Sequence, residues 1–253
     1  MRIALLGDIH ANLPALQAVL EHAAQKEIGA IWNVGDIVGY GSFPNEVIQV
    51  LRQTDATSIA GNYDLKVIGF PEKKAKWRKS KRAEKYIAFR WAYESLTAAN
   101  RRYLSRLPEE VRLKIAGRRI LLTHGSPASM DEHLTPATPV ERLMELAQLG
   151  RAEVIVCGHS HQAFTRQVGD TWFINTGSVG RPGDGDPRAA YAILDLNRKE
   201  FNIQHYRVEY NITAIVDAIR RAGLPEAFAQ MFIRGYDLDV VLGGPAEEPG
   251  EFE

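Results

Sequence analysis

Short apolar runs that end at a glycine alternate with amphipathic segments in the first part of the chain. The apolar runs have the length of buried strands, whereas the segments between them repeat their apolar residues at helical spacing. Asn12 is the predicted N-terminal cap of the first helix. Because strands and helices alternate through short connections, we expect right-handed crossovers and a parallel sheet. The predicted strands are Arg2–Leu6, Ala30–Val34 and Thr57–Ala60, and the second predicted helix is Pro44–Gln53.

The pattern changes twice further along the chain. Residues 65–108 hold a basic stretch and then a long helical pattern, in which Tyr86, Phe89 and Tyr93 are interpreted as packing residues. From about residue 162 to 207 strand patterns dominate. The expected elements are a hairpin of Val111–Ala116 and Arg119–Thr123, a helix over Pro139–Leu149, a strand over Val154–Cys157, the strand pairs Gln162–Val168 with Thr171–Asn175 and Ala189–Asp195 with Phe201–Val208, and helices over Thr213–Ala222 and Glu226–Ile233.

These elements predict an α/β (α+β) fold with a mixed layer first in the chain and a β-richer layer second. The two layers are expected to pack face to face as a four-layer β-sandwich flanked by helices. We expect one domain over residues 1–242, with 65–108 as a basic, helical insertion and 211–235 as C-terminal helices. Residues 243–253 are rich in Gly, Pro and Glu and predict a disordered acidic tail.

The composition of the chain argues against several classes of protein. The 253 residues include 31 basic and 31 acidic ones, and this neutrality argues against attachment to nucleic acid or lipid by bulk charge. We expect no membrane span, because no apolar run approaches roughly 20 residues, and no signal peptide. Cys157 is the one cysteine, interpreted as a core residue, and a cytoplasmic setting is expected.

The stretch Lys73–Lys85 is the local exception to this neutrality, with eight basic residues against one glutamate. A solvated surface segment is one interpretation. A surface that attracts anionic substrates, or binds nucleic acid, is the other.

Polar motifs follow the ends of five predicted strands, and each contains or adjoins a glycine. The carboxyl ends of parallel strands gather ligand-binding loops, so we expect these motifs to meet. The motifs are Gly7-Asp8-Ile9-His10, Gly35-Asp36-Ile37-Val38-Gly39, Gly61-Asn62-Tyr63-Asp64, Thr123-His124-Gly125 and Gly158-His159-Ser160-His161.

The side chains in these motifs are carboxylates, imidazoles and an amide. Such nitrogen and oxygen donors suit Mn, Fe, Zn, Co or Ni rather than a structural thiolate zinc site. In an extended segment, residues two apart project to the same side. Asp8 with His10, and His159 with His161, are therefore each expected to present two ligands to one place.

Each motif taken alone has a structural alternative. A Gly-Asp pair after a strand is usually a turn, and a lone histidine such as His124 is more often a hydrogen-bonded structural residue. Five such motifs at five strand ends do not arise easily from turn chemistry. Together they favour a metal site.

In this order the motifs resemble those of the calcineurin-like metallophosphoesterase superfamily, from Arg2 to about Asp195. Gly39-Tyr40-Gly41 and the run Asn175–Gly180 resemble a prokaryotic branch of small, single-domain members. The resemblance implies a β-sandwich flanked by helices and a hydroxide, shared by two divalent ions, that hydrolyses phosphoric esters. Manganese is expected first, with Fe, Zn, Ni or Co as alternatives. The implied ligands are Asp8, His10 and His161 for one ion, Asn62, His124 and His159 for the other, and Asp36 between them.

Tyr63 departs from the family pattern, because members with Gly-Asn-His use that histidine near the leaving group. A phenol is a poorer general acid at neutral pH, so we expect phosphodiesters or activated leaving groups to be favoured. His133 is the alternative proton donor, against an interpretation as a surface histidine. Ala11 stands where glycine is common, which is tolerated unless the backbone needs a positive φ. The candidate catalytic residues are Asp36, Asn62, Tyr63 and His124.

Two arginines are weaker candidates. Arg181 and Arg188 flank a loop rich in Gly, Asp and Pro, where either could grip a phosphate. The alternative is a salt bridge to Asp184 or Asp186. Asp64 is expected to orient a neighbour in the site.

The sequence therefore predicts a metal-dependent phosphoesterase that favours phosphodiesters and acts on a phosphorylated small molecule or nucleotide. Alternatives are a phosphomonoesterase, a nucleotide or dinucleoside polyphosphate hydrolase, a protein phosphatase, and a nuclease that uses Lys73–Lys85. A non-enzymatic scaffold of the same fold is disfavoured, because all seven ligand types are present. Nothing in the sequence indicates the oligomeric state.

Overall fold

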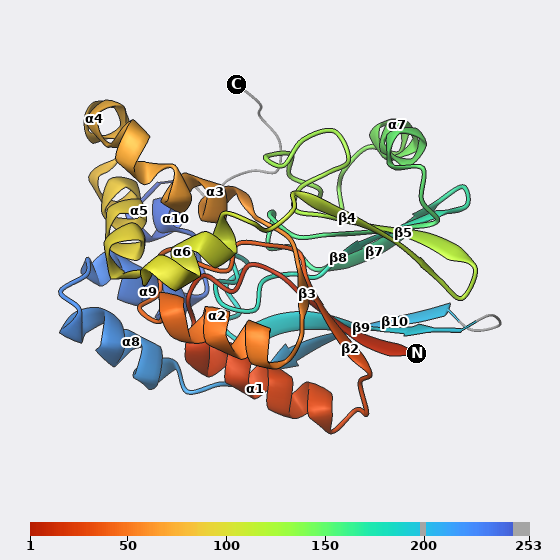
Figure 1. The fold of residues 1–253 in the computed structure, drawn as a ribbon, viewed down its shortest axis with the longest axis horizontal. Helices are drawn as coiled ribbons and strands as arrows, with labels where there is room; N and C mark the ends of the chain where they lie inside the picture. Colours follow the sequence, from red (N-terminus) through yellow and green to blue (C-terminus); the bar gives the residue numbers. More distant parts are fainter. Residues whose placement is uncertain (198–200, 245–253) are drawn as a thin grey trace.

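The computed structural model describes residues 1–197 and 201–244, and its strands form two five-stranded sheets (Figure 1). The strands are β1 (Arg2–Leu6), β2 (Ala30–Asn33), β3 (Thr57–Ser58), β4 (Glu110–Ile115), β5 (Arg118–Thr123), β6 (Val154–Cys157), β7 (Phe164–Val168), β8 (Thr171–Asn175), β9 (Ala189–Leu196) and β10 (Phe201–Val208). The helices are α1 (Leu13–Ala24), α2 (Pro44–Gln53), α3 (Asn62–Ile68), α4 (Phe70–Ser80), α5 (Ala83–Ser95), α6 (Ala98–Leu104), α7 (Val140–Gly150), α8 (Ile212–Arg221), α9 (Glu226–Arg234) and α10 (Leu238–Val241). The predicted acidic tail lies, from residue 245 onward, outside the described residues.

The first sheet has the order β10-β9-β1-β2-β3, and the second has the order β4-β5-β6-β8-β7. As predicted, β1, β2 and β3 are parallel, with Ile3 opposite Ala30 and Trp32 opposite Thr57. In the second sheet β5, β6 and β8 are parallel, and β4 and β7 are antiparallel strands at the edges.

The expectation that the late strands form one β-richer layer is wrong. Strand β9 pairs antiparallel with β1 in the first sheet, with Ala4 opposite Ile193, and β10 pairs with β9. Seven of the eight residues of β9 are buried, which is the pattern of a central strand covered on both faces. The first sheet therefore combines the first three strands of the chain with the last two, and the second sheet holds the five strands between them.

Side chains alternate between two cores along the central strands. On β1, Ile3 and Leu5 pack between the sheets, whereas Ala4 and Leu6 pack toward the helices that cover the first sheet. Helix α1 lies against the outer face of the first sheet and α7 against the second (Figure 1). The predicted helix–sheet–sheet–helix layering is confirmed.

Residues 65–108, the segment predicted as an insertion, are helical apart from short connections. The basic stretch within them forms most of α4 and the start of α5. Trp77 is 7% exposed and Phe89 is 2% exposed, and both join the core that covers the first sheet. The interpretation of Tyr86, Phe89 and Tyr93 as packing residues is confirmed. This insertion and the C-terminal helices α8–α10 lie at one end of the sandwich (Figure 1).

None of the helices in residues 1–197 and 201–244 is long and apolar enough to cross a membrane. Cys157 is fully buried in the core between the second sheet and α7, as predicted. Asn12 accepts a hydrogen bond from the Ala15 backbone N–H, which confirms it as the cap of α1.

Candidate metal centre

The polar motifs meet where the loops after the parallel strands are joined by backbone hydrogen bonds. The Asp8 N–H donates to the Gly35 carbonyl, and the His10 N–H donates to the Asp36 carbonyl, each at 2.9 Å. In the second sheet the Gly158 N–H donates to the His124 carbonyl at 2.8 Å. The two sheets are connected at this point, because the His159 N–H donates to Asp8 Oδ2 at 3.0 Å.

The ligands that lie two residues apart are not in extended backbone. The expectation that strand geometry makes their side chains project to the same side is therefore wrong. Five proposed ligands adopt the left-handed conformation, with φ between 48° and 66°: Asp8, His10, Asp36, His159 and His161. Each follows a strand end within a tight turn, whose curvature brings residues two apart to one side. Ala11 also has a positive φ, of 54°, where glycine would be unstrained. Clustered strain of this kind is typical of functional sites.

Asp8, His10 and His161 form the first cluster of donor atoms. All three side chains are at most 4% exposed, and their donor atoms lie within 4.8 Å of one another. His10 Nε2 lies 3.2 Å from His161 Nε2, and His161 Nε2 lies 3.2 Å from Asp8 Oδ1. These are the three residues that the family resemblance implies for one metal ion.

Asp36 faces both sides of the site. Its Oδ2 lies 3.7 Å from His10 Nε2, and its Oδ1 lies 3.5 Å from His124 Nε2. The donor atoms of Asp8, Asp36 and His124 form a second cluster within 4.8 Å. The two oxygens of one buried carboxylate therefore point to different histidines, which is the arrangement a shared ligand requires.

Asn62 and His159 are the other two residues that the family resemblance implies for the ion on the His124 side. The Asn62 amide group donates to Asp131 Oδ1 at 2.7 Å, which leaves its own oxygen free. The ring of His159 lies 5.0 Å from that of His124 and 4.3 Å from that of His133. His133 is thus beside the site, but on an exposed loop.

The donor set fits divalent cations. Among the described residues, two buried atoms of the proposed ligands on the His124 side have no hydrogen-bond partner: Asn62 Oδ1 and His124 Nε2. Buried polar atoms are normally paired. His124 Nδ1 lies 2.8 Å from the Val34 carbonyl, and donation to it in the neutral imidazole leaves the Nε2 lone pair for a metal ion.

Burial and neighbouring charges set the protonation of the site. Burial lowers the pKa of His159 to about 2 and lowers that of His10 well below its usual value, so both rings are neutral. Burial also disfavours charge on His124, but the Asp36 carboxylate outweighs it and raises the pKa of His124 to about 9. A cation must therefore displace a proton from His124, which makes metal binding weaker as the pH falls.

Two glycines allow the loops to approach the carboxylates. A Cβ at Gly61 would lie 2.1 Å from the Asp36 backbone nitrogen, and a Cβ at Gly158 would lie 2.4 Å from Asp8 Oδ2. Neither neighbour can move without moving a proposed ligand. The glycines of these motifs are thus required by close packing.

Tyr63 lies beside the site, with its ring 5.3 Å from that of His10 at an interplanar angle of 89°. Its hydroxyl is 2.6 Å from the Tyr40 hydroxyl. Burial raises the pKa of Tyr63 well above its usual value. The phenol is therefore occupied by a neighbouring tyrosine and stays neutral.

The two arginines differ in position. Arg181 is 9% exposed, its Nη1 donates to Asp237 Oδ1 at 2.7 Å, and its guanidinium lies 4.8 Å from the Tyr40 ring centroid. The expected alternative partners, Asp184 and Asp186, do not bind Arg181. Asp186 instead pairs with Arg188 in an exposed ion pair, which does not place Arg188 at the site.

Asp131, Tyr40 and Asp237 are site residues that the sequence reasoning missed. Asp131 orients the Asn62 amide, and Asp237 and Tyr40 hold Arg181. Asp131 lies 69 residues from Asn62, and Asp237 lies 56 residues from Arg181. The one available signal was the position of Tyr40 within Gly39-Tyr40-Gly41.

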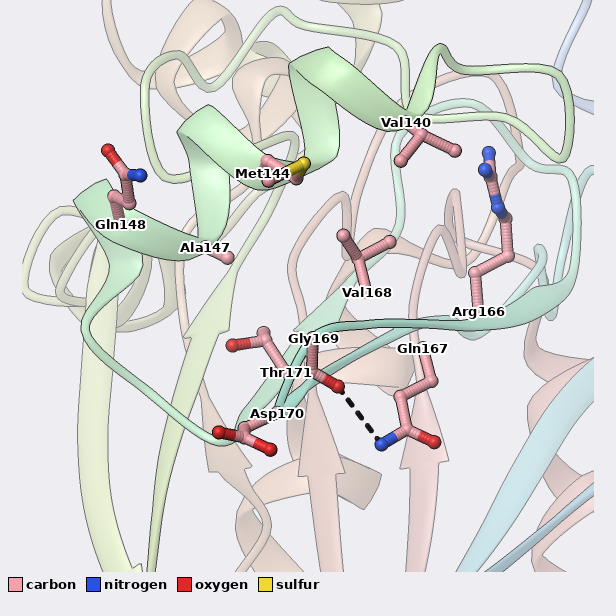
Figure 2. A pocket seen from close by; sticks show the side chains of 10 residues that line it. All are labelled: Val140, Met144, Ala147, Gln148, Arg166, Gln167, Val168, Gly169, Asp170 and Thr171. Atoms are coloured by element: carbon pink, nitrogen blue, oxygen red, sulfur yellow. Dashed lines mark hydrogen bonds between the residues drawn. The ribbon is translucent and has the colours of Figure 1, made fainter.

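A separate cleft of about 560 Å³ lies between α7 and the β7–β8 hairpin (Figure 2). Val140 and Met144 line it from the helix, and Arg166 and Asp170 line it from the hairpin. The side chains of the metal centre do not line this cleft, so the site chemistry lies elsewhere.

Comparison with known proteins agrees with this geometry. The family model of the calcineurin-like phosphoesterase superfamily domain matches residues 1–199. An uncharacterized protein of Methanocaldococcus jannaschii, MJ0912, is 32% identical over 252 residues, covering 92% of this chain and 98% of its own. Phosphodiesterase YfcE of Escherichia coli is 28% identical over 197 residues, covering 77% of this chain and 88% of its own.

Solved structures share the fold. The crystal structure of a metallophosphoesterase from Sphaerobacter thermophilus has a TM-score of 0.75 at 31% identity, covering 93% of this chain and all of the other. Protein PH1004 of Pyrococcus horikoshii has a TM-score of 0.84 at 24% identity and covers 92% of this chain and 98% of its own. The matched motifs, the sandwich and the buried donor clusters together place the chain in the calcineurin-like phosphoesterase superfamily, as a metal-dependent phosphoesterase.

Proposed function

We propose that the protein binds two divalent metal ions and hydrolyses phosphodiesters. Asp8, His10 and His161 would hold one ion and Asn62, His124 and His159 the other, with Asp36 shared between them. The observation that carries the proposal is the placement of Asp36, whose two oxygens face His10 and His124 at 3.7 and 3.5 Å. Manganese is the proposed native metal.

When bound, two such ions lower the pKa of a water molecule and offset negative charge on phosphoryl oxygens. Backbone N–H groups of the protein hold two of the proposed carboxylate ligands in position. The Tyr63 backbone N–H donates to Asp36 Oδ1 at 2.7 Å, and the His159 N–H fixes Asp8. Arg181 is the proposed phosphate contact, because its buried Nε has no hydrogen-bond partner among the described residues.

The preference for diesters is supported by the surroundings of Tyr63. Its hydroxyl lies 2.6 Å from that of Tyr40, and burial raises its pKa well above the usual value, which makes it a poor acid for protonating a basic alkoxide. Phosphodiesterase YfcE of E. coli carries this activity in its name, which agrees with the proposal. A phosphorylated small molecule or nucleotide is the proposed substrate, and a cytoplasmic location is proposed with it.

The function is tested by loading the protein with Mn²⁺, measuring bound metal by elemental analysis and following a chromogenic diester and the matching monoester. We expect two ions per chain and faster turnover of the diester. Turnover of neither ester with any divalent metal would contradict the proposed function. Turnover of the monoester far above the diester would contradict the role assigned to Tyr63.

Manganese is expected to stabilise the fold against heat. A ligand at a hundred times its dissociation constant adds about 2.7 kcal/mol of stability. In a chain of this size that corresponds to a rise in melting temperature of roughly 5–10 °C. Differential scanning fluorimetry with and without Mn²⁺ measures it, and Ca²⁺, which prefers oxygen donors, should give a smaller shift. An equal shift in a His161→Ala variant would show that Mn²⁺ binds elsewhere.

Removal of the Asp131 carboxylate is expected to weaken the metal centre. Without its acceptor the Asn62 amide can rotate and turn its oxygen away from the site. Loss of such an orienting partner typically costs about 10–100-fold in metal affinity or activity. The test is Mn²⁺ titration of Asp131→Ala beside Asp131→Asn, which keeps an acceptor oxygen and should stay near wild type. Equal affinity in both variants would contradict the orienting role.

A further inference from the structure

Three lysines lie along a line of aromatic rings that begins at the metal centre. The Tyr63 ring is 5.3 Å from that of His10, the Phe89 ring is 5.1 Å from that of Tyr63, and the Trp77 ring is 5.2 Å from that of Phe89. These rings come from α3, α5 and α4, so the line crosses the helical insertion. It leads from the proposed His10 ligand toward the basic face of α4.

The ammonium groups follow the same line. Lys66 Nζ is 5.5 Å from the centroid of the Tyr63 ring. Lys81 Nζ is 5.9 Å from the Phe89 ring and 5.3 Å from the Trp77 ring, and Lys73 Nζ is 5.6 Å from the Trp77 ring. We call Lys66, Lys81 and Lys73 the lysine row.

The near end of the lysine row reaches the metal centre through one carboxylate. Asp131 Oδ1 accepts from Lys66 Nζ at 3.4 Å and from the Asn62 amide at 2.7 Å. The ammonium group of Lys66 is therefore two hydrogen bonds away from a proposed metal ligand. The near end of the lysine row therefore lies at the edge of the metal centre.

The far end of the lysine row has no ion pair among the described residues. In the described part of the chain, the ion pairs of this region involve Lys66, Arg82 and Lys85, whereas neither Lys73 nor Lys81 has one. Burial, followed by the charges of Lys66 and Lys85, lowers the pKa of Lys81, and the Asp131 carboxylate offsets part of this effect. Like charges that converge without a partner are a binding place for an anion.

Covering aromatic surface is the alternative role for these lysines, since long side chains often lie over apolar groups with the charge in solvent. Lysines that only cover aromatic surface need not bring their ammonium groups close to one another. Lys74 and Lys79 are exposed lysines of α4 outside the lysine row. These two residues therefore provide a control with the same charge on the same helix.

We propose that the lysine row binds further phosphate groups of the substrate, so that the substrate carries a chain of phosphates with one at the metal centre. The inference rests on the proposed function and names its substrate class. Because Phe89 and Trp77 are at most 7% exposed, they offer no face for base stacking, and recognition is of phosphates alone. An oligonucleotide and a nucleoside polyphosphate share this chemistry.

Binding is measured first, in chelator, so that it does not depend on catalysis. The probe is a fluorescent thymidine hexanucleotide followed by anisotropy, with unlabelled dinucleoside tetraphosphate as the competitor. The double variant Lys73→Gln/Lys81→Gln is expected to bind the hexanucleotide at least about tenfold more weakly, and to lower the slope of log affinity against log salt by about 1.4. Lys74→Gln/Lys79→Gln should stay within about twofold of wild type. Whichever of the two ligands binds more tightly identifies the source of the phosphate chain.

Turnover is measured second, with manganese. The row variant should lose kcat/KM for a substrate with several phosphates and keep it for a chromogenic diester with one. Equal losses in the row and control variants, or no binding of either probe by the wild type, would overturn the proposal. Binding without turnover of any ester would contradict the proposed function and leave the lysine row supported.

Discussion

Replacing Asp36 by asparagine is expected to lower the turnover of a chromogenic diester by roughly 10³-fold, the equivalent of about 4 kcal/mol. Asp36 is 1% exposed, and its oxygens face His10 and His124. An asparagine keeps the shape but removes the negative charge, and it must turn an NH2 group toward one of these histidines. The Tyr63 backbone N–H donates to Asp36 Oδ1 at 2.7 Å, so in the variant the amide oxygen is expected at this position and the NH2 group at the position of Oδ2. Neither ion would then have a shared anionic ligand.

Steady-state kinetics and elemental analysis of Asp36→Asn measure this effect together. We expect fewer than two bound ions and a lower kcat that added manganese does not restore. Asp170→Asn is the matched control, because Asp170 is an exposed residue at the β7–β8 turn and lines the separate cleft. If Asp36→Asn binds two ions and keeps a tenth of wild-type turnover, the proposal that Asp36 is a shared ligand is contradicted.

The elements of the fold could be predicted because the information is local. Apolar runs such as Val154–Cys157 are buried strands wherever they lie, and Pro44–Gln53 carries its helical period within itself. The pairing of β9 with β1 was not predictable in this way. A strand that is apolar on both faces has no period to indicate its neighbour, and Ala4 and Ile193 meet only in the folded chain.

The candidate metal centre, like the fold, could be predicted only in part from the sequence. The motifs after the strand ends predicted the candidate donor residues, and the family resemblance implied how they are divided between two ions. Their conformation could not be predicted, because the left-handed backbone at Asp8 and His10 goes with hydrogen bonds that these residues donate to the distant loop after β2. Asp131 and Asp237 were missed because a carboxylate in a loop has no local signature. Both act on residues more than fifty positions away.

The C-terminal helical segment also contributes to the candidate site. It lies beyond the residues matched by the family model, yet Asp237 binds Arg181 and thereby fixes a buried guanidinium beside Tyr40. Burial of an arginine is costly unless it is paired. Asp237 supplies that pairing, and the proposed phosphate contact therefore depends on a segment outside the shared family domain.

Replacing Asp64 by alanine is expected to destabilise the fold by roughly 3–6 kcal/mol, because three buried backbone N–H groups lose their acceptor. The Asp64 side chain is fully buried and accepts from Ile37, Val38 and Gly61 at 3.2, 3.0 and 2.9 Å. It therefore joins the loop that follows Asp36 to the loop that carries Asn62. In a chain of this size the loss corresponds to a fall in melting temperature of about 10–20 °C.

Thermal melting of Asp64→Ala beside Asp64→Asn separates the acceptor role from the charge. An amide oxygen can still accept from the loop amides, so the asparagine variant should lose less stability than the alanine variant. Manganese affinity should fall in the same order, since both loops position metal ligands. A melting temperature for Asp64→Ala close to wild type would mean that water satisfies the amides of Ile37, Val38 and Gly61. The carboxylate would then not be what joins the two loops.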